Sequence, residues 1–244
     1  MITSKDNKLI KLFNSLKSKK YSREYHKCFV ESEKVIRELY KKSLIDTVLI
    51  TEKKAFLLKE FSSIKYELIS ENIANFLSEN VTNDGIFAIA NIPNDDNIFD
   101  YSKCIILDRI QDPSNLGAII RSAVAFGYKT IITIDSVYPF TAKAIRSSMG
   151  YVFDVNFVDL NIDELIKIKE NHNLKILSAD MTGENIDNID KPSSNYSIVI
   201  GNEGGGISQE IIDITDKFVS IPMQNNVESL NASVSASLIM YLLK

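Results

Sequence analysis

Cysteine and histidine are scarce in this sequence, with two residues of each among 244. Cys28 and Cys104 lie far apart, so they predict neither a disulfide framework nor a metal cluster. His26 and His172 are also isolated, which argues against a zinc site built on histidine. We therefore expect a reduced protein that contains no metal.

Long apolar runs are absent as well. No run approaches the about 18 residues that a membrane-spanning helix needs. The N-terminal stretch MITSKDNKLI lacks the apolar core of a signal peptide. These two absences predict a cytoplasmic protein that does not associate with membranes.

Charge is distributed unevenly along the chain. Residues 1–42 hold 12 Lys/Arg and 5 Asp/Glu, a net charge of +7, whereas residues 93–244 hold 12 and 20, a net of −8. Such asymmetry indicates a basic contact surface for RNA or another polyanion on an otherwise acidic body. The alternative is that KLIKLFNSLKSKKYSR forms a solvated amphipathic helix with no ligand.

The first 91 residues alternate helix and strand at short intervals. Helical spacing occurs over 7–16 and 31–42, and short runs typical of strands occupy 46–51, 65–70 and 85–91. This pattern predicts a small α/β domain over residues 1–91. Residues 92–101 are polar and include Pro93, so we expect a linker there.

A regular alternation of strands and helices follows over residues 102–244. Strands are expected at 103–110, 130–135, 155–160, 174–180, 197–201 and 218–223, with helices near 115–126, 142–149, 162–171, 208–215 and 230–243. Strands joined by helical crossovers form a parallel sheet with helices on both faces. Ligands of such sheets bind beyond the carboxyl ends of the strands. Three stretches fall there: DRIQDPSNLGAIIRSA, GNEGGGIS and IPMQNNVESLNASVSAS.

Three of the nine glycines are consecutive, in the second of these stretches. Neither the Lys of a phosphate-binding P-loop nor the G-x-G-x-x-G dinucleotide pattern is present. The glycines therefore favour close approach of backbone to a flat, uncharged ligand, or positive φ angles in a bent loop. Glu203 would repel phosphate but can accept hydrogen bonds from a cationic or hydroxyl-bearing ligand. A plain turn between strand and helix is the alternative.

The first and third stretches carry polar residues with two interpretations. Ser114 or Asn115 could cap a helix, as could Ser229 or Asn231. Arg121 lies on an otherwise apolar helix, where it is either paired or on the polar surface. Small residues near the start of the last helix would let a ligand or a second subunit pack closely; these are Ala232, Ser233, Ser235, Ala236 and Ser237.

Taken together and in this order, the three stretches resemble the motifs of the SpoU/TrmH family of RNA ribose 2′-O-methyltransferases. The resemblance covers residues 100–244. It extends more loosely to residues 5–90, which are similar to the substrate-binding domain of many members. That domain has a basic helix, an Arg and a strand ending in Glu-Gly, where this chain has Glu31-Ser32.

The resemblance implies a fold, a cofactor and a reaction. The fold is a SPOUT-like parallel sheet whose C-terminal segment forms a trefoil knot, although general topology rules favour an ordinary doubly wound sheet. The cofactor is S-adenosyl-L-methionine, and the reaction methylates a ribose 2′-hydroxyl in structured RNA, with ribosomal RNA favoured. The resemblance also implies a homodimer with its active site near the subunit interface.

Other functions stay open at this point. One is methylation of transfer RNA, and another is a non-catalytic homologue that binds RNA during ribosome assembly. A nucleotide-hydrolysing P-loop protein is nearly excluded by the missing Lys.

The resemblance assigns roles residue by residue. The catalytic set is Asn115, Arg121, Glu203, Ser229 and Asn231. The cofactor-binding set is Gly201, Asn202, Gly204, Gly205, Gly206, Ile221, Met223, Ser229, Leu230 and Asn231. We expect RNA contacts from Lys17, Lys19, Lys20 and Arg23.

Two points concern particular residues. Arg121 is expected either to act as a base or to anchor a phosphate and stabilise the developing alkoxide; guanidinium rarely deprotonates, which favours the second role. Asn225 stands where the third motif usually has Gly. Among residues other than Gly, Asn best tolerates the left-handed backbone conformation, so the loop could keep its shape.

Overall fold

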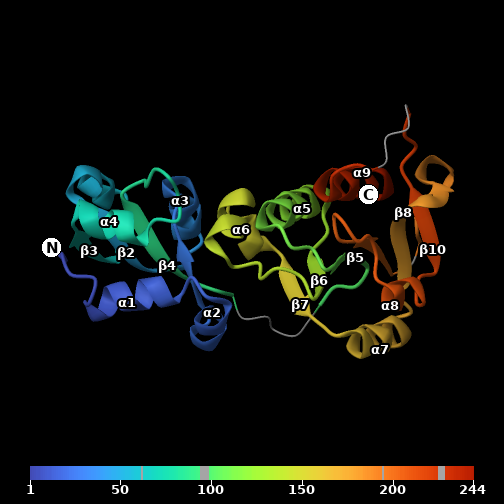
Figure 1. Ribbon diagram of the computed structural model, residues 1–244, viewed down its shortest axis with the longest axis horizontal. Coiled ribbons are helices and arrows are strands. Elements are labelled where there is room, and N and C mark those ends of the chain that lie inside the picture. The colour runs from blue at the N-terminus through green and yellow to red at the C-terminus, as the bar shows by residue number, and fades with distance from the viewer. Residues whose placement is uncertain (62, 94–98, 194, 225–228) are drawn as a thin grey trace. The chain divides into compact units, whose positions relative to one another are not determined.

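The computed structural model describes residues 1–61, 63–93, 99–193, 195–224 and 229–244. The chain forms two compact units, whose elements are labelled in Figure 1. The first unit comprises residues 1–94 and 138–153, and the second comprises 95–137 and 154–244. This division differs from the predicted boundaries, which placed all of 102–244 in one domain.

A four-stranded sheet lies at the centre of the first unit. Its strands are β1 (Lys27–Val30), β2 (Ile45–Thr51), β3 (Lys65–Ile69) and β4 (Ile86–Asn91), in the spatial order β1-β4-β2-β3. Strand β4 runs antiparallel to β1 and β2, and β2 runs parallel to β3. The strands predicted from the sequence at 46–51, 65–70 and 85–91 are confirmed within one residue.

Helices and 3₁₀ turns surround this sheet. They are α1 (Lys8–Ser15), α2 (Lys19–Tyr25), α3 (Glu33–Lys41), η1 (Glu52–Lys59) and α4 (Glu71–Leu77). Phe13 of α1 and Ile73 of α4 pack in one buried apolar cluster with Phe29 and Phe87 of the sheet. The periodic apolar positions of α1 and α4 therefore attach these helices to the sheet.

The junction between β1 and α3 carries the departure from the Glu-Gly pattern. Ser32 caps α3, and its φ of −179° is extended backbone that any residue adopts. The buried carboxylate of Glu31 accepts hydrogen bonds from the Ser78 hydroxyl and the Glu79 amide. Glycine is therefore not required at position 32, and the turn forms without it.

Residues 138–153 belong to the first unit although the sequence around them belongs to the second. They contain α6 (Ala142–Ser147) and begin the 3₁₀ turn η2 (Tyr151–Asp154). Ala142 is part of the same apolar cluster as Phe13 and Phe29. A Cβ at Gly150, where φ is +83°, would lie 3.1 Å from a methyl group of Val35. This segment thus completes the core of the first unit.

The second unit contains a six-stranded parallel sheet. Its strands are β5 (Lys103–Asp108), β6 (Thr130–Ile134), β7 (Asn156–Asp159), β8 (Lys175–Asn185), β9 (Tyr196–Ile200) and β10 (Lys217–Ser220). The spatial order is β10-β8-β9-β5-β6-β7, and every adjacent pair is parallel. All six strands overlap the predicted ones, although β8 runs five residues beyond its expected end at 180, and the α/β class is confirmed.

Helices cover both faces of this sheet, as Figure 1 shows. They are α5 (Pro113–Phe126) and α9 (Ala232–Leu243) on one face, and α7 (Ile162–His172) and α8 (Gln209–Ile212) on the other; a short 3₁₀ turn, η3, spans Ile186–Asn188. Leu165 of α7 and Ile211 of α8 pack against Ile106, Ile132 and other apolar residues of the strands.

The trefoil knot stays a prediction from the resemblance. No helix within the described residues is long and apolar enough to cross a membrane.

Candidate functional site

The carboxyl ends of the neighbouring strands β5 and β9 are joined by a buried carboxylate. Asp108, the last residue of β5, is fully buried and accepts a hydrogen bond of 2.6 Å from the amide of Ser208. Its other oxygen lies 3.3 Å from Nε of Arg109. A guanidinium nitrogen of Arg109 donates in turn to the carbonyl of Gly206, at 3.3 Å. The first predicted stretch is thereby fixed to the second.

Asn202 organises the glycine loop. Its Oδ1 accepts hydrogen bonds of 2.9 Å from the amides of Gly204 and Gly205, and its Nδ2 donates to the carbonyl of Arg109 at 2.8 Å. The backbone of Asn202 also exchanges two hydrogen bonds with Gly206. Since the side chain is committed to the loop on both its polar atoms, Asn202 shapes the site rather than offering a free amide to a ligand.

Glycine occupies the positions of this loop for different structural reasons. A Cβ at Gly201 would lie 2.5 Å from the carbonyl carbon of Gly206, too close for any side chain. Gly206 has a φ of +62°, which confirms the expected positive φ. A Cβ at Gly204 or Gly205 would meet only Oδ1 of Asn202, at 3.6 to 3.7 Å. Close packing within the protein therefore requires Gly201, and it does not explain Gly204 and Gly205.

Asn115 lies in the first turn of α5 and does not cap it. Asp112 is the N-cap, because its side chain accepts from the Ser114 amide at 2.8 Å. The side chain of Asn115 is instead held across the motifs: Nδ2 donates to Oε1 of Glu203 at 2.6 Å, and Oδ1 accepts from Nδ2 of Asn231 at 3.0 Å. One residue from each of the three stretches thus takes part in a single hydrogen-bonded chain.

The sequence left open whether Asn231 is a helix cap or part of the site. In the structure it caps α9 and also contacts Asn115. Its Oδ1 accepts from the amide and hydroxyl of Ser233, at 2.9 and 2.7 Å, and so caps α9. Its Nδ2 is left to orient Asn115. Because Asn231 fixes which end of the Asn115 amide faces it, the other end of that amide points its N–H toward Glu203.

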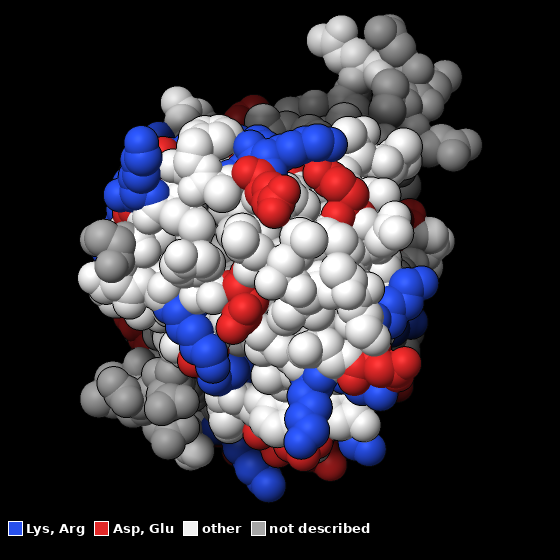
Figure 2. Space-filling view, turned by 90° about the vertical axis from the view of Figure 1, so that its left-hand side faces the viewer, with Lys and Arg blue, Asp and Glu red and all other residues white. Residues whose placement is uncertain are grey.

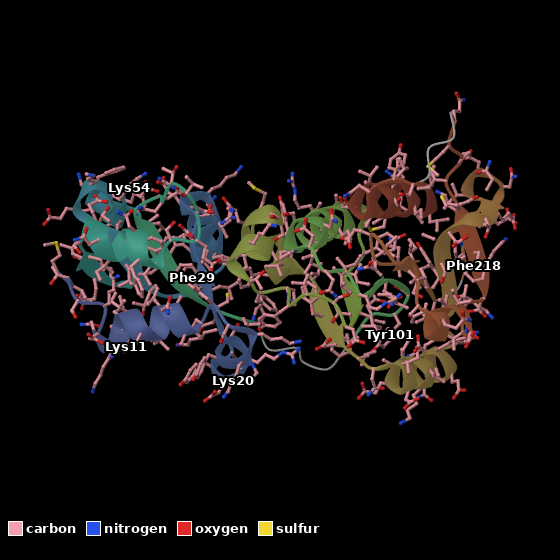
Figure 3. The ribbon with its side chains drawn as sticks, viewed as in Figure 1. Lys11, Lys20, Phe29, Lys54, Tyr101 and Phe218 are labelled. Atoms are coloured by element: carbon pink, nitrogen blue, oxygen red, sulfur yellow. The ribbon has the colours of Figure 1, made fainter. Side chains whose placement is uncertain are left out.

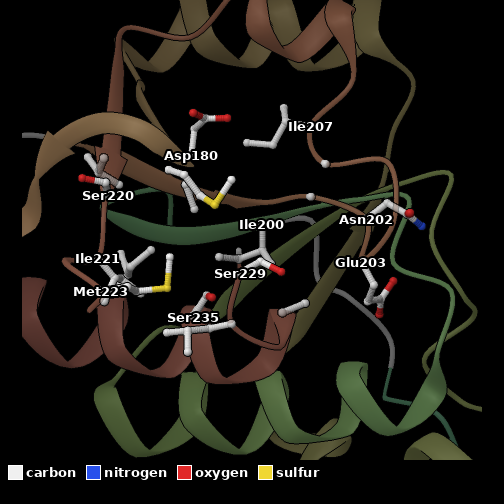
Figure 4. A pocket seen from close by; sticks show the side chains of 18 of the residues that line it. Asp180, Ile200, Asn202, Glu203, Ile207, Ser220, Ile221, Met223, Ser229 and Ser235 are labelled. Atoms are coloured by element: carbon white, nitrogen blue, oxygen red, sulfur yellow. The ribbon is translucent and has the colours of Figure 1, made fainter. Parts of the chain in front are cut away.

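A cavity of about 450 Å³ lies beside this chain of hydrogen bonds. Figure 4 shows it between the glycine loop, the middle of β8, the segment after β10 and the start of α9. Its apolar lining comes from Ile200, Ile207, Ile221, Met223, Leu230 and Ile239. A volume of this size is typical of sites for cofactors and other small molecules.

The charged groups around the cavity are carboxylates. Asp180 and Glu203 line it, and among the described lining residues there is no Lys or Arg. Phosphate would therefore meet repulsion without compensation, whereas a cationic ligand would be attracted. The apolar walls suit a flat aromatic ring, and the hydroxyls of Ser220, Ser229 and Ser235 offer hydrogen bonds. These residues fit S-adenosylmethionine, which combines adenine with a sulfonium and an ammonium.

Most of the predicted cofactor-binding residues line this cavity. They are Gly201, Asn202, Gly204, Gly206, Ile221, Met223, Ser229 and Leu230; Gly205 and Asn231 do not. Asn225, at the usual Gly position, lies outside the described residues. Asp180 was not predicted, although it ends the expected strand at 174–180, which is where ligands of parallel sheets bind. Oδ1 of Asp180 accepts from the amide and hydroxyl of Thr182.

Arg121 is separate from the Asn115 cluster. It is exposed on α5, does not line the cavity, and has no hydrogen bond or ion pair within the described parts of the chain. Six residues of α-helix separate two positions by about 9 Å along the axis and about 120° around it, so Arg121 and Asn115 leave the helix in different directions.

The small residues of α9 pack inside the second unit. Ala232 and Ser235 line the cavity, and the hydroxyl of Ser237 lies 2.6 Å from that of Ser122 on α5. The sequence allowed either a ligand or a second subunit beside these residues, and the cavity and α5 take these positions.

The four predicted RNA-binding residues lie around α2 of the first unit and differ in exposure. Lys19, Lys20 and Arg23 are exposed. Lys17 is half-buried with its ammonium 5.1 Å from the Phe29 ring centre, and burial lowers the pKa of this ammonium although Glu79 and Glu31 oppose the shift. Lys17 is therefore the least available of the four for phosphate.

Part of the +7 excess of residues 1–42 is neutralised by ion pairs. Lys11, Lys27, Arg37 and Lys41 are ion-paired with carboxylates. On the face of the first unit turned toward the viewer in Figure 2, Lys and Arg are interspersed with Asp and Glu. The exposed cations of α2 therefore indicate where RNA could bind better than the net charge of residues 1–42 does.

Both cysteines are buried. Burial raises the pKa of the Cys28 thiol well above its usual range and that of Cys104 to about 12. Neither thiol is poised to act as a nucleophile at neutral pH. Across the described ranges, no group of three or more His, Cys, Asp or Glu side chains is placed to hold a metal ion.

Fold and site together define an α/β protein with a small-molecule cavity, bordered by carboxylates, at the carboxyl ends of the parallel strands β9 and β10. Residues 102–241 match the SpoU rRNA methylase family, so the chain belongs to that family.

Individual relatives extend the match beyond this region. The 23S rRNA (guanosine(2553)-2′-O)-methyltransferase RlmP of Bacillus subtilis is 26% identical over 246 residues, which cover 100% of this chain and 98% of the relative. The 23S rRNA (adenosine(1067)-2′-O)-methyltransferase of Streptomyces laurentii is 30% identical over 189 residues, 75% of this chain and 70% of the relative. The crystal structure of the AdoMet-bound rRNA methyltransferase from Sinorhizobium meliloti has a TM-score of 0.85 at 21% identity, covering 99% and 96% of the two chains.

Proposed function

We propose that this protein transfers a methyl group from S-adenosylmethionine to a ribose 2′-hydroxyl of ribosomal RNA. The observation that carries the proposal is the hydrogen-bonded chain Glu203–Asn115–Asn231 beside a largely apolar cavity whose charged lining residues are carboxylates. Ribosomal RNA is favoured over transfer RNA because the two relatives described above are named for 23S rRNA, and one matches along the full chain. Such a substrate would place the reaction in the cytoplasm.

Different residues of the cavity would bind different parts of the cofactor. Ile221, Met223 and Leu230 would hold the adenine, and the Asp180 and Glu203 carboxylates would attract the cationic part. When bound, S-adenosylmethionine supplies an electrophilic methyl group. Its attacking partner, a ribose hydroxyl, is a weak nucleophile and must lose a proton to become effective.

Glu203 is the residue that we assign to this proton. Oε1 is held by Asn115, whereas Oε2 has no hydrogen bond among the described residues and is exposed beside the cavity. A carboxylate fixed through one oxygen can accept a hydroxyl proton with the other. Asn115 and Asn231 are then positioning residues, because they orient Glu203 through the amide of Asn115. Ser229 lies at the cavity wall and offers a hydroxyl to cofactor or ribose.

We assign to Arg121 the binding of the phosphate next to the methylated ribose. The guanidinium is exposed and unpaired among the described residues, and Arg binds phosphate in a bidentate manner. In this position it would anchor the RNA and stabilise the negative charge that develops on the attacking oxygen. Since a guanidinium rarely gives up its proton, we favour phosphate binding and charge stabilisation over the role of a base for Arg121.

We further propose that the protein is a homodimer that forms through α9. Val234, Leu238 and Tyr241 are 45%, 39% and 52% exposed and recur at helical spacing, so they form one apolar stripe on the outside of this helix. Because α9 packs on α5, a second copy on this stripe would lie close to the helix that carries Arg121. Sedimentation velocity should show a dimer for the natural protein and a monomer for Leu238→Glu; a monomeric natural protein would refute this part.

The function itself is tested in two steps. Calorimetric titration should show binding of S-adenosylmethionine and none of ATP, since the cavity repels phosphate. Transfer of a labelled methyl group to ribosomal RNA, followed by mapping of the methylated ribose, should give one site that is lost in cells without the gene. A folded protein that binds neither the cofactor nor ribosomal RNA would overturn the proposal.

A further inference from the structure

Helix α2 lies beside β1 and exposes most of its side chains. Of its seven residues, Lys19–Tyr25, one is buried, Ser22. The hydroxyl of Ser22 lies 3.0 Å from that of Tyr138, and the guanidinium of Arg23 lies over the Tyr138 ring at 5.5 Å. Isolated helices of this length are unstable in water. Tyr138 thus helps to hold α2, while all side chains of the helix except Ser22 are exposed.

Two of those exposed side chains are aromatic and parallel. The rings of Tyr21 and Tyr25 are 6.3 Å apart between centres, at an interplanar angle of 11°, and the residues are 39% and 47% exposed. They are one helical turn apart, so the pair forms a continuous aromatic surface on one side of α2. Helix formation alone does not require tyrosine at either position.

Cations surround the pair. The ammonium of Lys20 lies 5.6 Å from the centre of the Tyr21 ring, and Lys19 and Arg23 are exposed on the same short helix, against a single acidic residue, Glu24. Figure 3 shows Lys20 on α2. An apolar protein surface would have to desolvate these charges, which is costly. An RNA strand satisfies both features, since its phosphates pair with the cations and its bases stack on the rings.

We propose that Tyr21 and Tyr25 form a stacking platform for an unpaired base of the RNA substrate, flanked by Lys19, Lys20 and Arg23 as phosphate contacts. This inference rests on the proposed function, because it assigns to that RNA a single-stranded segment bound by the first unit. A base-paired segment cannot present its ring faces to a side chain, so the platform selects unpaired nucleotides.

The experiment compares three variants of the full-length protein in binding to a ribosomal RNA transcript. Tyr21→Ala/Tyr25→Ala removes both rings and should weaken binding about 5- to 150-fold, the range measured for loss of base–aromatic stacking. Tyr21→Phe/Tyr25→Phe keeps the rings and should bind within about twofold of the natural protein. Lys20→Ala should instead reduce the slope of log K against log salt by about 0.7 to 0.9, which the tyrosine variants leave unchanged.

A second comparison uses short RNA. A single-stranded oligonucleotide should lose affinity in the alanine variant, whereas a fully paired duplex of the same sequence should not. Cofactor affinity and circular dichroism should stay as in the natural protein, because both tyrosines are exposed.

Three results would overturn the platform. They are equal RNA affinity of the alanine variant, equal losses for duplex and single strand, and a change in oligomeric state in place of RNA affinity. If the natural protein itself neither binds nor methylates ribosomal RNA, the proposed function fails instead, and the two failures are distinct.

Discussion

Replacing Gly201 by Ala should disrupt the site, whereas replacing Gly205 by Ala should not. At Gly201 the added Cβ would lie 2.5 Å from the carbonyl carbon of Gly206 and 2.7 Å from the amide nitrogen of Ile207. Carbon atoms in favourable contact are about 3.5 to 4.0 Å apart, so the loop backbone must move by about 1 Å. Overpacking of this kind costs about 1 to 3 kcal/mol of folding free energy. For a chain of this size that lowers Tm by about 2 to 4 °C per kcal/mol.

Gly205 is the matched control, since it lies in the same loop. A Cβ there would meet only Oδ1 of Asn202, at 3.6 Å, and its backbone is not in the left-handed region. Its amide would still donate to Asn202. We expect a change in stability within about 0.5 kcal/mol.

Scanning calorimetry and cofactor titration check both variants. Gly201→Ala should melt earlier and bind S-adenosylmethionine more weakly, because the carbonyl of Gly206 holds Arg109 and the loop lines the cavity. If Gly201→Ala matched Gly205→Ala in both measurements, tight packing between Gly201 and Gly206 would not be what maintains the loop.

Three further predictions follow from the site and from the edge of the sheet. Arg121→Ala should abolish methylation with cofactor Kd unchanged, measured by methyl transfer and titration, and rescue by Arg121→Lys would show that a point charge suffices where we expect bidentate binding. Glu203→Gln keeps an acceptor for Asn115 but cannot take a proton, so kcat should fall about 10²- to 10⁴-fold; undiminished kcat would exclude Glu203 as the base. Partial burial raises the pKa of Asp216, but hydrogen bonds from the Ile176 amide and the Lys169 ammonium outweigh it and lower that pKa. Its contribution, within about 1 kcal/mol for a pair that water still reaches, is present above the ordinary aspartate pKa and lost as the pH falls below about 4. Urea unfolding should therefore show Asp216→Asn destabilised at pH 7 and equal to the natural protein at pH 2.

The parallel sheet could be predicted because its three central strands, β5, β6 and β9, are short apolar runs buried on both faces. The edge strands β7 and β10 are only partly buried but keep a short apolar run. The end of β8 could not be predicted, because this strand continues to Asn185, beyond the expected end at 180. Its last residues are exposed and polar, yet they pair with β10 after a shift in register. Such a half-exposed extension carries no apolar signal. In the first unit, β1 has four residues and α4 has seven, too few for periodicity to identify.

The site could be predicted as a set of motifs but not as a set of contacts. Polar residues at strand ends indicated Asn115, Glu203 and Asn231, and the resemblance assigned their roles. That Asn231 orients Asn115 depends on how three loops meet, which no local pattern contains. Asp180 could have been proposed by the same rule, since it is the last residue of the strand expected at 174–180, although in the structure it lies within β8. The proposed role of Tyr21 and Tyr25 depends on exposure, which the sequence does not show.

The placement of residues 138–153 has a consequence for how the chain folds as it leaves the ribosome. N-terminal domains generally fold first during synthesis. Here the apolar cluster of the first unit includes Ala142, and Gly150 packs against Val35, so this core stays open until about 60 further residues have been made. Those residues include β5, α5 and β6 of the second unit. The two units therefore cannot mature one after the other, and a nascent chain stalled before residue 138 would expose an unfinished core to chaperones.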